Sequence, residues 1–366
     1  MICPYCIMDD TVPDIQFYPD GCTYCKQWQK RATKDFHSPL ELTDLLYRAR
    51  EDNKGKDFNC IIGLSGGMDS SFVALKCIDF GLKPYAIHLD NTWNTPEAEH
   101  NIEALVSYLN IPLERITVNW PEFRDLQLAF LRSGVPNCEI PTDHGLLATL
   151  FKRASDLGIK YILSGGNLVT EGIMPEAWSY ETKDWKHIKA IWKKHGNYCA
   201  DYSSSYPHLT LFSWFYHIFV RGVRFIPILN YVDYDPVSAE NLLADLIGWE
   251  PYGTKHFESI YTRWFQGYLL PKRWGIDKRK AFYSSLICAG LMSRETALLK
   301  LSSQGRFYPQ YPDDMSYVIK HLGISHEEME ELVHQPGKQH SDYPSNARVL
   351  NAISGLVPRI KRFAST

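Results

Sequence analysis

Short apolar runs alternate with stretches of helical character between residues 58 and 166. The apolar runs are FNCIIGL (58–64), KPYAIHLDN (83–91), ERITVNW (114–120) and KYILSGG (160–166). The segments between them predict a helix ending near Gly81 and helices over 96–109, 121–132 and 143–156. Strands that alternate with helices are typical of a parallel sheet covered on both faces. We therefore expect a Rossmann-like α/β core that binds its ligand at the carboxyl ends of the strands.

The rest of the chain adds a segment on each side of this core. A length of 366 residues fits two or three domains. A helix is predicted over 37–51, with Ser38 as N-cap, Pro39 in its first turn and Glu41 completing a capping box. Beyond residue 236, helices are predicted over 237–247, 255–269, 277–289, 293–302, 312–321 and 325–334. The predicted units are a metal ribbon (1–35), the α/β domain (36–235) and a helical C-terminal region (236–366), whose last thirty residues suggest a peripheral tail.

Charge and hydropathy exclude several broad classes of protein. The 39 basic and 42 acidic residues give a formal charge of -3, which disfavours a broad nucleic-acid-binding face. No apolar run approaches the roughly 18 residues that cross a bilayer, and the N-terminus lacks the pattern of a secretory signal. We expect a cytoplasmic protein without a membrane or nucleic-acid partner.

Four of the nine cysteines lie in the first 25 residues. Cys3 and Cys6 form one C-x2-C pair, and Cys22 and Cys25 form a second after 15 intervening residues. This spacing is typical of a site in which four thiolates surround a structural zinc ion. An iron–sulfur cluster uses the same ligand type and remains an alternative. The other five, which we expect mainly in the core, are Cys60, Cys77, Cys138, Cys199 and Cys288.

The first core strand runs directly into a glycine-rich loop that precedes a helix. Glycines permit a tight turn and close approach to a ligand, while hydroxyl groups and free N–H groups at the helix start bind anions. The loop is not a Walker A motif, since it lacks the lysine, and it lacks the G-x-G-x-x-G fingerprint. Asp69 either caps the helix or helps to hold magnesium. The predicted nucleotide-binding residues here are Ser65, Gly66, Gly67, Asp69, Ser70 and Ser71.

Polar residues follow other strands at the same predicted edge. Asp90 and Asn91 end the second run, where they either form a turn or contact the metal and nucleotide. Gly165 and Gly166 end the fourth run and either terminate the strand or support the nucleotide, and Glu171 is a candidate magnesium ligand.

A turn between these strands carries three further ionisable residues, Glu139, Asp143 and His144. Asp143 either caps the next helix or, beside the imidazole, acts as a tuned acid or base. Both readings stay open from the sequence alone.

Residues Ser65–Ser70 match the pattern SGGxDS, which resembles the PP-loop of the ATP pyrophosphatase superfamily. Longer blocks are similar to the N-acetyl sugar amidotransferases of the WbpG type, a family that includes proteins of pseudaminic and legionaminic acid biosynthesis. The resemblance covers nearly the whole chain through HLDNTWN (88–94), VPNCEIPTDHG (135–145), SGGNLVTEGIMPEAW (164–178), GWEPYGTKHFES (248–259) and GIDKRKAFYSSLICAGLMSRE (275–295), among other blocks.

The resemblance implies a reaction that uses ATP and Mg²⁺. Such a protein converts an N-acetyl group of a nucleotide-linked bacterial surface sugar into an acetamidino group, through an O-adenylyl imidate that ammonia attacks. It releases AMP and pyrophosphate. The expected catalytic residues are Asp69, Asp143, His144 and Glu171, and the expected substrate-binding residues are Asn91, Trp93, Glu139, Arg263, Lys278 and Arg279.

The source of ammonia is expected to be a separate protein. Ile2 stands where an N-terminal-nucleophile glutaminase needs cysteine, and His256 and Glu258 form an H-x-E pair without a matching nucleophile elbow. The family pattern implies partners that resemble the glutaminase and cyclase subunits of imidazole glycerol phosphate synthase.

Two rival functions follow from the same motifs. A PP-loop tRNA thiolase also combines this loop with paired C-x2-C ribbons, but thiolation needs further cysteines at the site. A non-enzymatic scaffold regulated by nucleotide is the other alternative, against which the complete loop argues.

Overall fold

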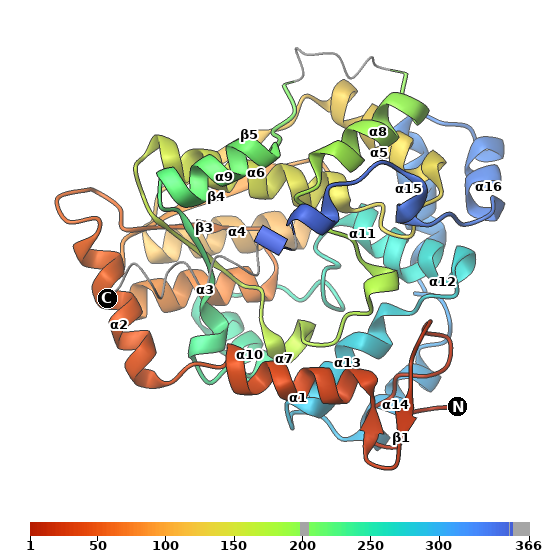
Figure 1. Ribbon diagram of the computed structural model, residues 1–366, viewed down its shortest axis with the longest axis horizontal. Coiled ribbons are helices and arrows are strands. Elements are labelled where there is room, and N and C mark those ends of the chain that lie inside the picture. Colours follow the sequence, from red (N-terminus) through yellow and green to blue (C-terminus); the bar gives the residue numbers. More distant parts are fainter. Residues whose placement is uncertain (198–204, 351, 354–366) are drawn as a thin grey trace.

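A five-stranded parallel sheet forms the centre of the protein (Figure 1). The computed structural model describes residues 1–197, 205–350 and 352–353, so Cys199 lies outside the described residues. The order is β5-β4-β3-β6-β7, and all neighbouring strands are parallel. The strands are β3 (Cys60–Gly63), β4 (Pro84–Asp90), β5 (Leu113–Thr117), β6 (Tyr161–Ser164) and β7 (Arg224–Pro227). The four predicted strands are confirmed, whereas β7 was not predicted.

Alternating side chains of the strands supply two separate cores. Ile62 of β3 belongs to a cluster with Phe72 of α3 and Leu105 of α4, while its neighbour Ile61 joins Phe151 of α6 on the other face. Helices therefore cover both faces, as the alternation of strands and helices predicts. The helices around the sheet are α3 (Met68–Asp79), α4 (Pro96–Leu109), α5 (Trp120–Ser133), α6 (Ile140–Asp156) and α10 (Pro236–Ile247).

The N-terminal ribbon packs beside the C-terminal helices at the lower right of Figure 1. It comprises β1 (Phe17–Tyr18), β2 (Gly21–Cys22) and α1 (Thr23–Asp35), followed by α2 (Pro39–Glu51). The predicted capping box is present: the Glu41 N–H donates to Ser38 Oγ at 3.3 Å, and the Ser38 N–H donates to Glu41 Oε2 at 2.8 Å. These reciprocal bonds fix the start of α2 at Pro39.

Short helices connect β6 to β7 and lead into α10. They are α7 (Leu168–Glu171), the 3-10 turn Glu176–Trp178, α8 (Trp185–His195), α9 (Leu211–Phe215), the π-turn Tyr216–Val220 and the 3-10 turn Ile228–Tyr231. Among the aromatic residues of this stretch, Tyr206 and Trp214 are buried, while Phe212 is exposed.

The C-terminal region is helical, with one correction to its predicted boundaries. The segment expected as a helix over 255–269 begins only at Ile260, because Ser259 accepts the Thr262 N–H as an N-cap and His256 has a φ of 68°. The elements are α11 (Ile260–Trp264), the π-turn Phe265–Leu269, α12 (Leu270–Arg273), α13 (Lys278–Cys288), α14 (Arg294–Ser303), α15 (Tyr311–Leu322), α16 (His326–His334) and the 3-10 turn His340–Asp342.

The segment after α16 returns to the body of the protein. His340, Tyr343 and Leu350 are buried, so this part of the expected peripheral tail is packed. Among the residues that the structure describes, no helix is both long enough and apolar enough to traverse a bilayer.

Candidate active site

The glycine-rich loop lies between β3 and α3, at the point where the strand order reverses. β4 and β5 extend from β3 on one side, and β6 and β7 extend on the other. Gly66 has a φ of 77°, and a Cβ there would lie 2.3 Å from the Ala98 carbonyl oxygen. A Cβ on Gly67 would lie 2.7 Å from Glu258 Oε1. Gly66 is therefore required both by its positive φ and by the close approach of the Ala98 backbone, whereas Gly67 is approached by the end of the Glu258 side chain.

The three serines of the loop have different surroundings. Ser65 Oγ and Ser70 Oγ lie 3.2 Å apart, and Ser65 Oγ also accepts the Gly67 N–H at 3.2 Å. Ser71 is fully buried and donates to the Gly67 carbonyl at 2.9 Å. Ser65 and Ser70 thus remain at the loop, whereas Ser71 stabilises the first turn of α3.

A segment from the C-terminal half, residues 252–258, lies against this loop, and we call it the strap. Tyr252 Oη accepts the Met68 N–H at 2.9 Å, and Ser65 Oγ donates to Glu258 Oε1 at 3.1 Å. Tyr252 and Lys255 were not singled out from the sequence. The only local signal is Ser259, whose N-cap pattern ends the strap and starts α11.

The strap places Lys255 between two carboxylates that the sequence assigned to the site. Its ammonium group donates to Asp69 Oδ2 and lies 3.0 Å from Glu171 Oε1 and 2.7 Å from Thr170 Oγ1. Although burial alone would lower it, Asp69 and Glu171 raise the pKa of Lys255. The other Asp69 oxygen accepts the Tyr234 hydroxyl.

This arrangement does not match the expected magnesium site. Asp69 and Glu171 do lie together, but the Lys255 ammonium is already their shared counter-ion. A divalent ion between the same oxygens would meet the positive charge of Lys255. We therefore derive no step through a metal held by these two carboxylates.

Glu258 has an unusual environment for an acidic residue. Burial raises the pKa of Glu258 to about 7, against the opposing effects of hydrogen bonds from its own backbone N–H and from Ser65. Its Oε2 is buried and has no hydrogen-bond partner among the described residues. Nearby in the strap, the His256 side chain is 47% exposed, and its Nε2 lies 3.6 Å from Glu171 Oε1.

The other strand ends lie at the same edge of the sheet. Asp90 accepts the Thr92 N–H at 2.9 Å, and Asn91 accepts the Trp93 N–H at 3.3 Å, so both stabilise the turn after β4. A Cβ on Gly165 would lie 3.0 Å from the Asp69 Cβ, which explains glycine there. Gly166 donates its N–H to Ser164 Oγ at 3.1 Å.

Glu139 and Asp143 form a second acidic pair at the start of α6. Although burial would raise it, Lys278 at 3.2 Å and a hydrogen bond from Gln266 lower the pKa of Glu139. Asp143 is exposed to solvent, so burial contributes little to its pKa, and the nearby Glu139 carboxylate raises that pKa. Two carboxyl groups with different surroundings thus lie close together at the start of α6.

His144 lies in the core rather than at an accessible site. The side chain is fully buried, with Nδ1 2.6 Å from the Thr182 carbonyl and Nε2 accepting the Leu209 N–H at 2.9 Å. Burial lowers the pKa of His144 to about 4. Because backbone groups engage both ring nitrogens, we assign His144 a structural role instead of the expected catalytic one.

Trp93 and two arginines also differ from their expected substrate role. Trp93 is fully buried and donates from Nε1 to Gln127 Oε1 at 2.8 Å. Arg263 forms a bidentate pair with buried Asp314 at 2.8 and 2.7 Å, and Arg279 forms another with Asp277 at 2.9 and 2.7 Å. These side chains hold helices together, and their fixed partners leave no geometry that favours a phosphate clamp.

A hollow of about 370 Å³ adjoins Glu171 on the side of the ribbon. Its lining includes Arg31 and Asp35 of α1, together with Gly166 and Asn230. α1 is fastened there because Trp28 donates to the Leu168 carbonyl at 3.0 Å and Arg31 donates to the Gly172 carbonyl at 3.0 Å. The ribbon therefore forms part of the surroundings of the site.

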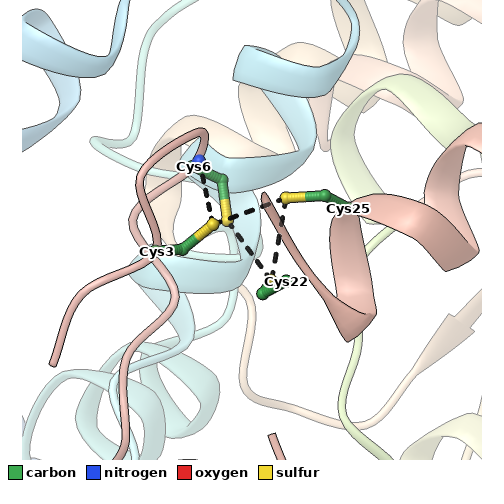
Figure 2. Close-up of side chains that lie close together, drawn as sticks. All are labelled: Cys3, Cys6, Cys22 and Cys25. Carbon is green, nitrogen blue, oxygen red and sulfur yellow. Dashed lines mark hydrogen bonds between the residues drawn. The ribbon is translucent and has the colours of Figure 1, made fainter. Parts of the chain in front are cut away.

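The four N-terminal cysteines converge, as the C-x2-C spacing predicts (Figure 2). Their Sγ atoms all lie within 4.8 Å of one another, with separations of 3.8 Å for Cys3–Cys25, 3.9 Å for Cys6–Cys22 and 3.7 Å for Cys22–Cys25. Zn–S bonds of about 2.3 Å in a tetrahedron separate the sulfurs by about 3.8 Å. The donor set and spacing fit one tetrahedral metal ion, whereas a cluster of several irons would hold the sulfurs farther apart.

Fold and loop together define an α/β protein with the PP-loop signature at the switch point of its sheet. Residues 258–356 match the family model described as "LPS biosynthesis protein WbpG-like, C-terminal domain". The chain therefore carries a WbpG-like C-terminal domain, and the expected WbpG-type resemblance is confirmed. No curated protein matches the chain.

Solved structures give distant likenesses. NMN synthetase from Francisella tularensis is 18% identical, with a TM-score of 0.28, 57% of this chain covered and 94% of that one. NH3-dependent NAD synthetase from Campylobacter jejuni is 16% identical, with a TM-score of 0.29 and coverages of 62% and 99%. U34-tRNA thiolase NcsA from Methanococcus maripaludis is 13% identical, with a TM-score of 0.30 and 81% of each chain covered. Likenesses at this level carry no argument about function.

Proposed function

We propose that this protein is an ATP-dependent amidotransferase that turns an N-acetyl group of a nucleotide-linked bacterial surface sugar into an acetamidino group. The observation that carries the proposal is the contact between the Ser65–Ser71 loop and the strap, which ends at the first residue of the WbpG-like match. Loop and C-terminal domain thus meet at one site. The loop resembles the PP-loop of ATP pyrophosphatases, and the C-terminal domain resembles that of WbpG-like proteins, so both parts support an ATP-dependent amidotransferase.

The loop suits a nucleotide triphosphate. The Ser65 and Ser70 hydroxyls lie at the start of α3, beside a tight turn at Gly66 and Gly67 that Ala98 and Glu258 approach closely. Lys255 adds a positive charge at the same edge. Backbone N–H groups at a helix start, hydroxyl groups and an ammonium group are the donors that polyphosphates require.

The proposed reaction has two displacements. The acetamido oxygen attacks the α-phosphorus of ATP, the bond to the β-phosphate oxygen breaks, and pyrophosphate leaves. The nitrogen loses its proton, which gives a neutral O-adenylyl imidate. Ammonia then adds to the imidate carbon, and the carbon–oxygen bond breaks, so that AMP leaves with the former acetyl oxygen. The product amidine takes up a proton in water.

Residues of this chain would direct these steps. Lys255 is suited to offset charge that develops on the phosphates, because it is buried beside the loop. Asp143, whose pKa the Glu139 carboxylate raises, is suited to exchange a proton with the acetamido nitrogen or the ammonia. Exclusion of water would protect the imidate from hydrolysis.

The ribbon and the partners complete the proposal. The four thiolates would hold a structural zinc ion, since a shell of four cysteine sulfurs leaves no open position for chemistry. Ammonia would come from separate glutaminase and cyclase-like subunits. The site would work in the cytoplasm, where nucleotide sugars and ATP are available.

Mass spectrometry of candidate nucleotide sugars tests the proposal. N-acetylated sugars are incubated with the protein, ATP, magnesium and an ammonium salt, and we expect one amide oxygen to be replaced by NH. The Asp69→Asn variant should lose this conversion, whereas Asp79→Asn, at the exposed far end of the same helix, should retain it. Pyrophosphate release stimulated by tRNA but by no nucleotide sugar would instead establish the thiolase alternative.

Cysteine placement argues against thiolation within the described residues. Cys138, the thiol nearest the acidic turn in sequence, is fully buried, and its Sγ faces the carbonyl groups of Phe130 and Val135. Cys60 and Cys77 are also buried, in β3 and α3. These thiols would need to move in order to carry sulfur to a substrate.

A further inference from the structure

The backbone fixes Glu258 beside the nucleotide loop. Its carbonyl oxygen accepts the Thr95 N–H at 2.9 Å, and the flanking residues Asn94 and Ser259 form an antiparallel bridge. The Ile260 N–H also donates to the Trp93 carbonyl at 2.8 Å. The chain just before α4 thus anchors the end of the strap. The position of the Glu258 carboxyl is therefore set by main-chain bonds on both sides of it.

The carboxyl group points at the start of α3 and is only half satisfied. Oε1 accepts the Ser65 hydroxyl at 3.1 Å and lies 2.7 Å from the place that a Cβ on Gly67 would take. Oε2 is buried away from solvent without any partner among the described residues. A buried polar atom without a partner is destabilising, so such an atom often indicates a ligand that completes its bonding. Here the neighbouring surface is the expected site of polyphosphate.

The groups that face Glu258 come from four elements. The loop supplies the Ser65 hydroxyl, α3 supplies the Asp69 carboxylate, and the strap itself supplies Lys255 and Tyr252. The start of α4 contributes the Thr95 backbone N–H, which is uncharged. Lys255 favours the ionised form of Glu258, whereas Asp69 and burial disfavour it, and the neutral form prevails up to neutral pH.

We propose that Glu258 recognises the nucleotide as a neutral carboxylic acid, which donates its Oε2 hydrogen to a phosphate oxygen bound at the Ser65–Ser71 loop. The inference rests on the proposed ATP site and deepens it. A carboxylate at this place would repel a polyphosphate, whereas the acid supplies the missing hydrogen bond. Above neutral pH, nucleotide binding must therefore draw one proton from the solvent onto Glu258.

Calorimetry tests this proton uptake directly. Wild-type protein is titrated with α,β-methylene ATP and magnesium at pH 8, in buffers of different ionisation enthalpy. With a free pKa of about 7, roughly 0.9 proton should be taken up per nucleotide bound. Glu258→Gln keeps the shape and a hydrogen-bond donor, so its uptake should be lower by that amount, and because it needs no proton its affinity at pH 8 should be up to about tenfold higher than that of the wild type. The nucleotide's own protonation is common to both proteins and cancels in the comparison.

A matched variant controls for the loss of a carboxyl group elsewhere. Asp79→Asn should keep the full uptake, because Asp79 is exposed at the end of α3 that is far from the loop. As a second measurement, wild-type affinity should fall up to tenfold per pH unit above pH 7, whereas that of Glu258→Gln should be flatter. Equal uptake in wild type and Glu258→Gln, or uptake lost only in Asp79→Asn, would overturn the inference. Absence of nucleotide binding in every protein would instead refute the proposed ATP site.

Discussion

The Lys255→Met substitution should show how much the ion pairs between the strap and the loop region contribute to the stability of the protein. The substitution keeps a long unbranched side chain but removes the ammonium group that Asp69 and Glu171 share. The side chains of Lys255 and Asp69 are only 14% and 17% exposed, so water cannot readily replace the lost cation. We expect a marked loss of stability rather than the small effect of a surface pair.

The magnitude follows from distance and burial. At the 3.0 Å between Lys255 and Glu171, Coulomb attraction with an effective dielectric constant of about 20 is about 5.5 kcal/mol, and Asp69 adds a second attraction. Desolvation offsets several kcal/mol of this sum, and Glu171, at 34% exposure, is partly screened. Breaking a buried pair by removing one partner costs about 3–5 kcal/mol. We expect a value near the lower end, about 3 kcal/mol.

Urea unfolding followed by tryptophan fluorescence and circular dichroism measures this loss. A double-mutant cycle with Asp69→Asn isolates the pair, because asparagine keeps polar contacts but carries no charge. The double variant should lose about 2 kcal/mol less unfolding free energy than the two single variants lose in sum. A coupling energy below about 0.5 kcal/mol would refute the view that Lys255 is the counter-ion of Asp69.

Three further predictions concern the loop, the ribbon and the core. Gly66→Ala should cost about 2–3 kcal/mol of stability and at least tenfold in nucleotide affinity, since its Cβ would lie 2.3 Å from the Ala98 oxygen. Gly55→Ala is the control, because Gly55 also has a positive φ (81°) but lies in open space; it should cost only about 1 kcal/mol and leave nucleotide affinity unchanged. Equal losses in the two variants would refute this account of the loop. Metal analysis should find one zinc per chain, lost in Cys22→Ser but kept in Cys138→Ala; iron with labile sulfide would contradict the fit. Burial lowers the pKa of His144 in the folded state to about 4, below its ordinary 6.5. The unfolded chain therefore binds the proton first as pH falls. Stability should decrease between about pH 6.5 and pH 4, by up to about 3 kcal/mol. In urea unfolding across that pH range, His144→Gln should lose less free energy of unfolding than the wild type, whereas His100→Gln, at an exposed position, should lose as much as the wild type. The same dependence of unfolding free energy on pH in all three proteins would contradict the predicted direction.

The sequence predicted those structural features that depend on residues close together in the chain. The capping box of Ser38 and Glu41, the glycines at the ends of β3 and β6, and the paired C-x2-C knuckles each depend on residues close together in the chain. Each of these predictions is confirmed. Strand β7 was not predicted, because its four residues lie between turn formers and show no clear alternation of apolar and polar side chains.

Residues with distant partners were the ones misjudged. Arg263 was expected to bind the substrate, but it pairs with Asp314, which lies 51 positions away. The strap looked helical because its composition allows a helix, yet its bonds to the loop bridge more than 180 residues. Tertiary contacts overrode local preference there, and no pattern in a single sequence reports such contacts.

The origin of the oxygen in AMP tests the central claim most directly. An N-acetylated nucleotide sugar that carries ¹⁸O in its acetyl carbonyl is converted with ATP and ammonium, and the products are examined by ³¹P NMR and mass spectrometry. The account predicts AMP and pyrophosphate in equal amounts, with the ¹⁸O label in the AMP phosphate and an unlabelled amidine. ADP and inorganic phosphate, or AMP without the label, would contradict it.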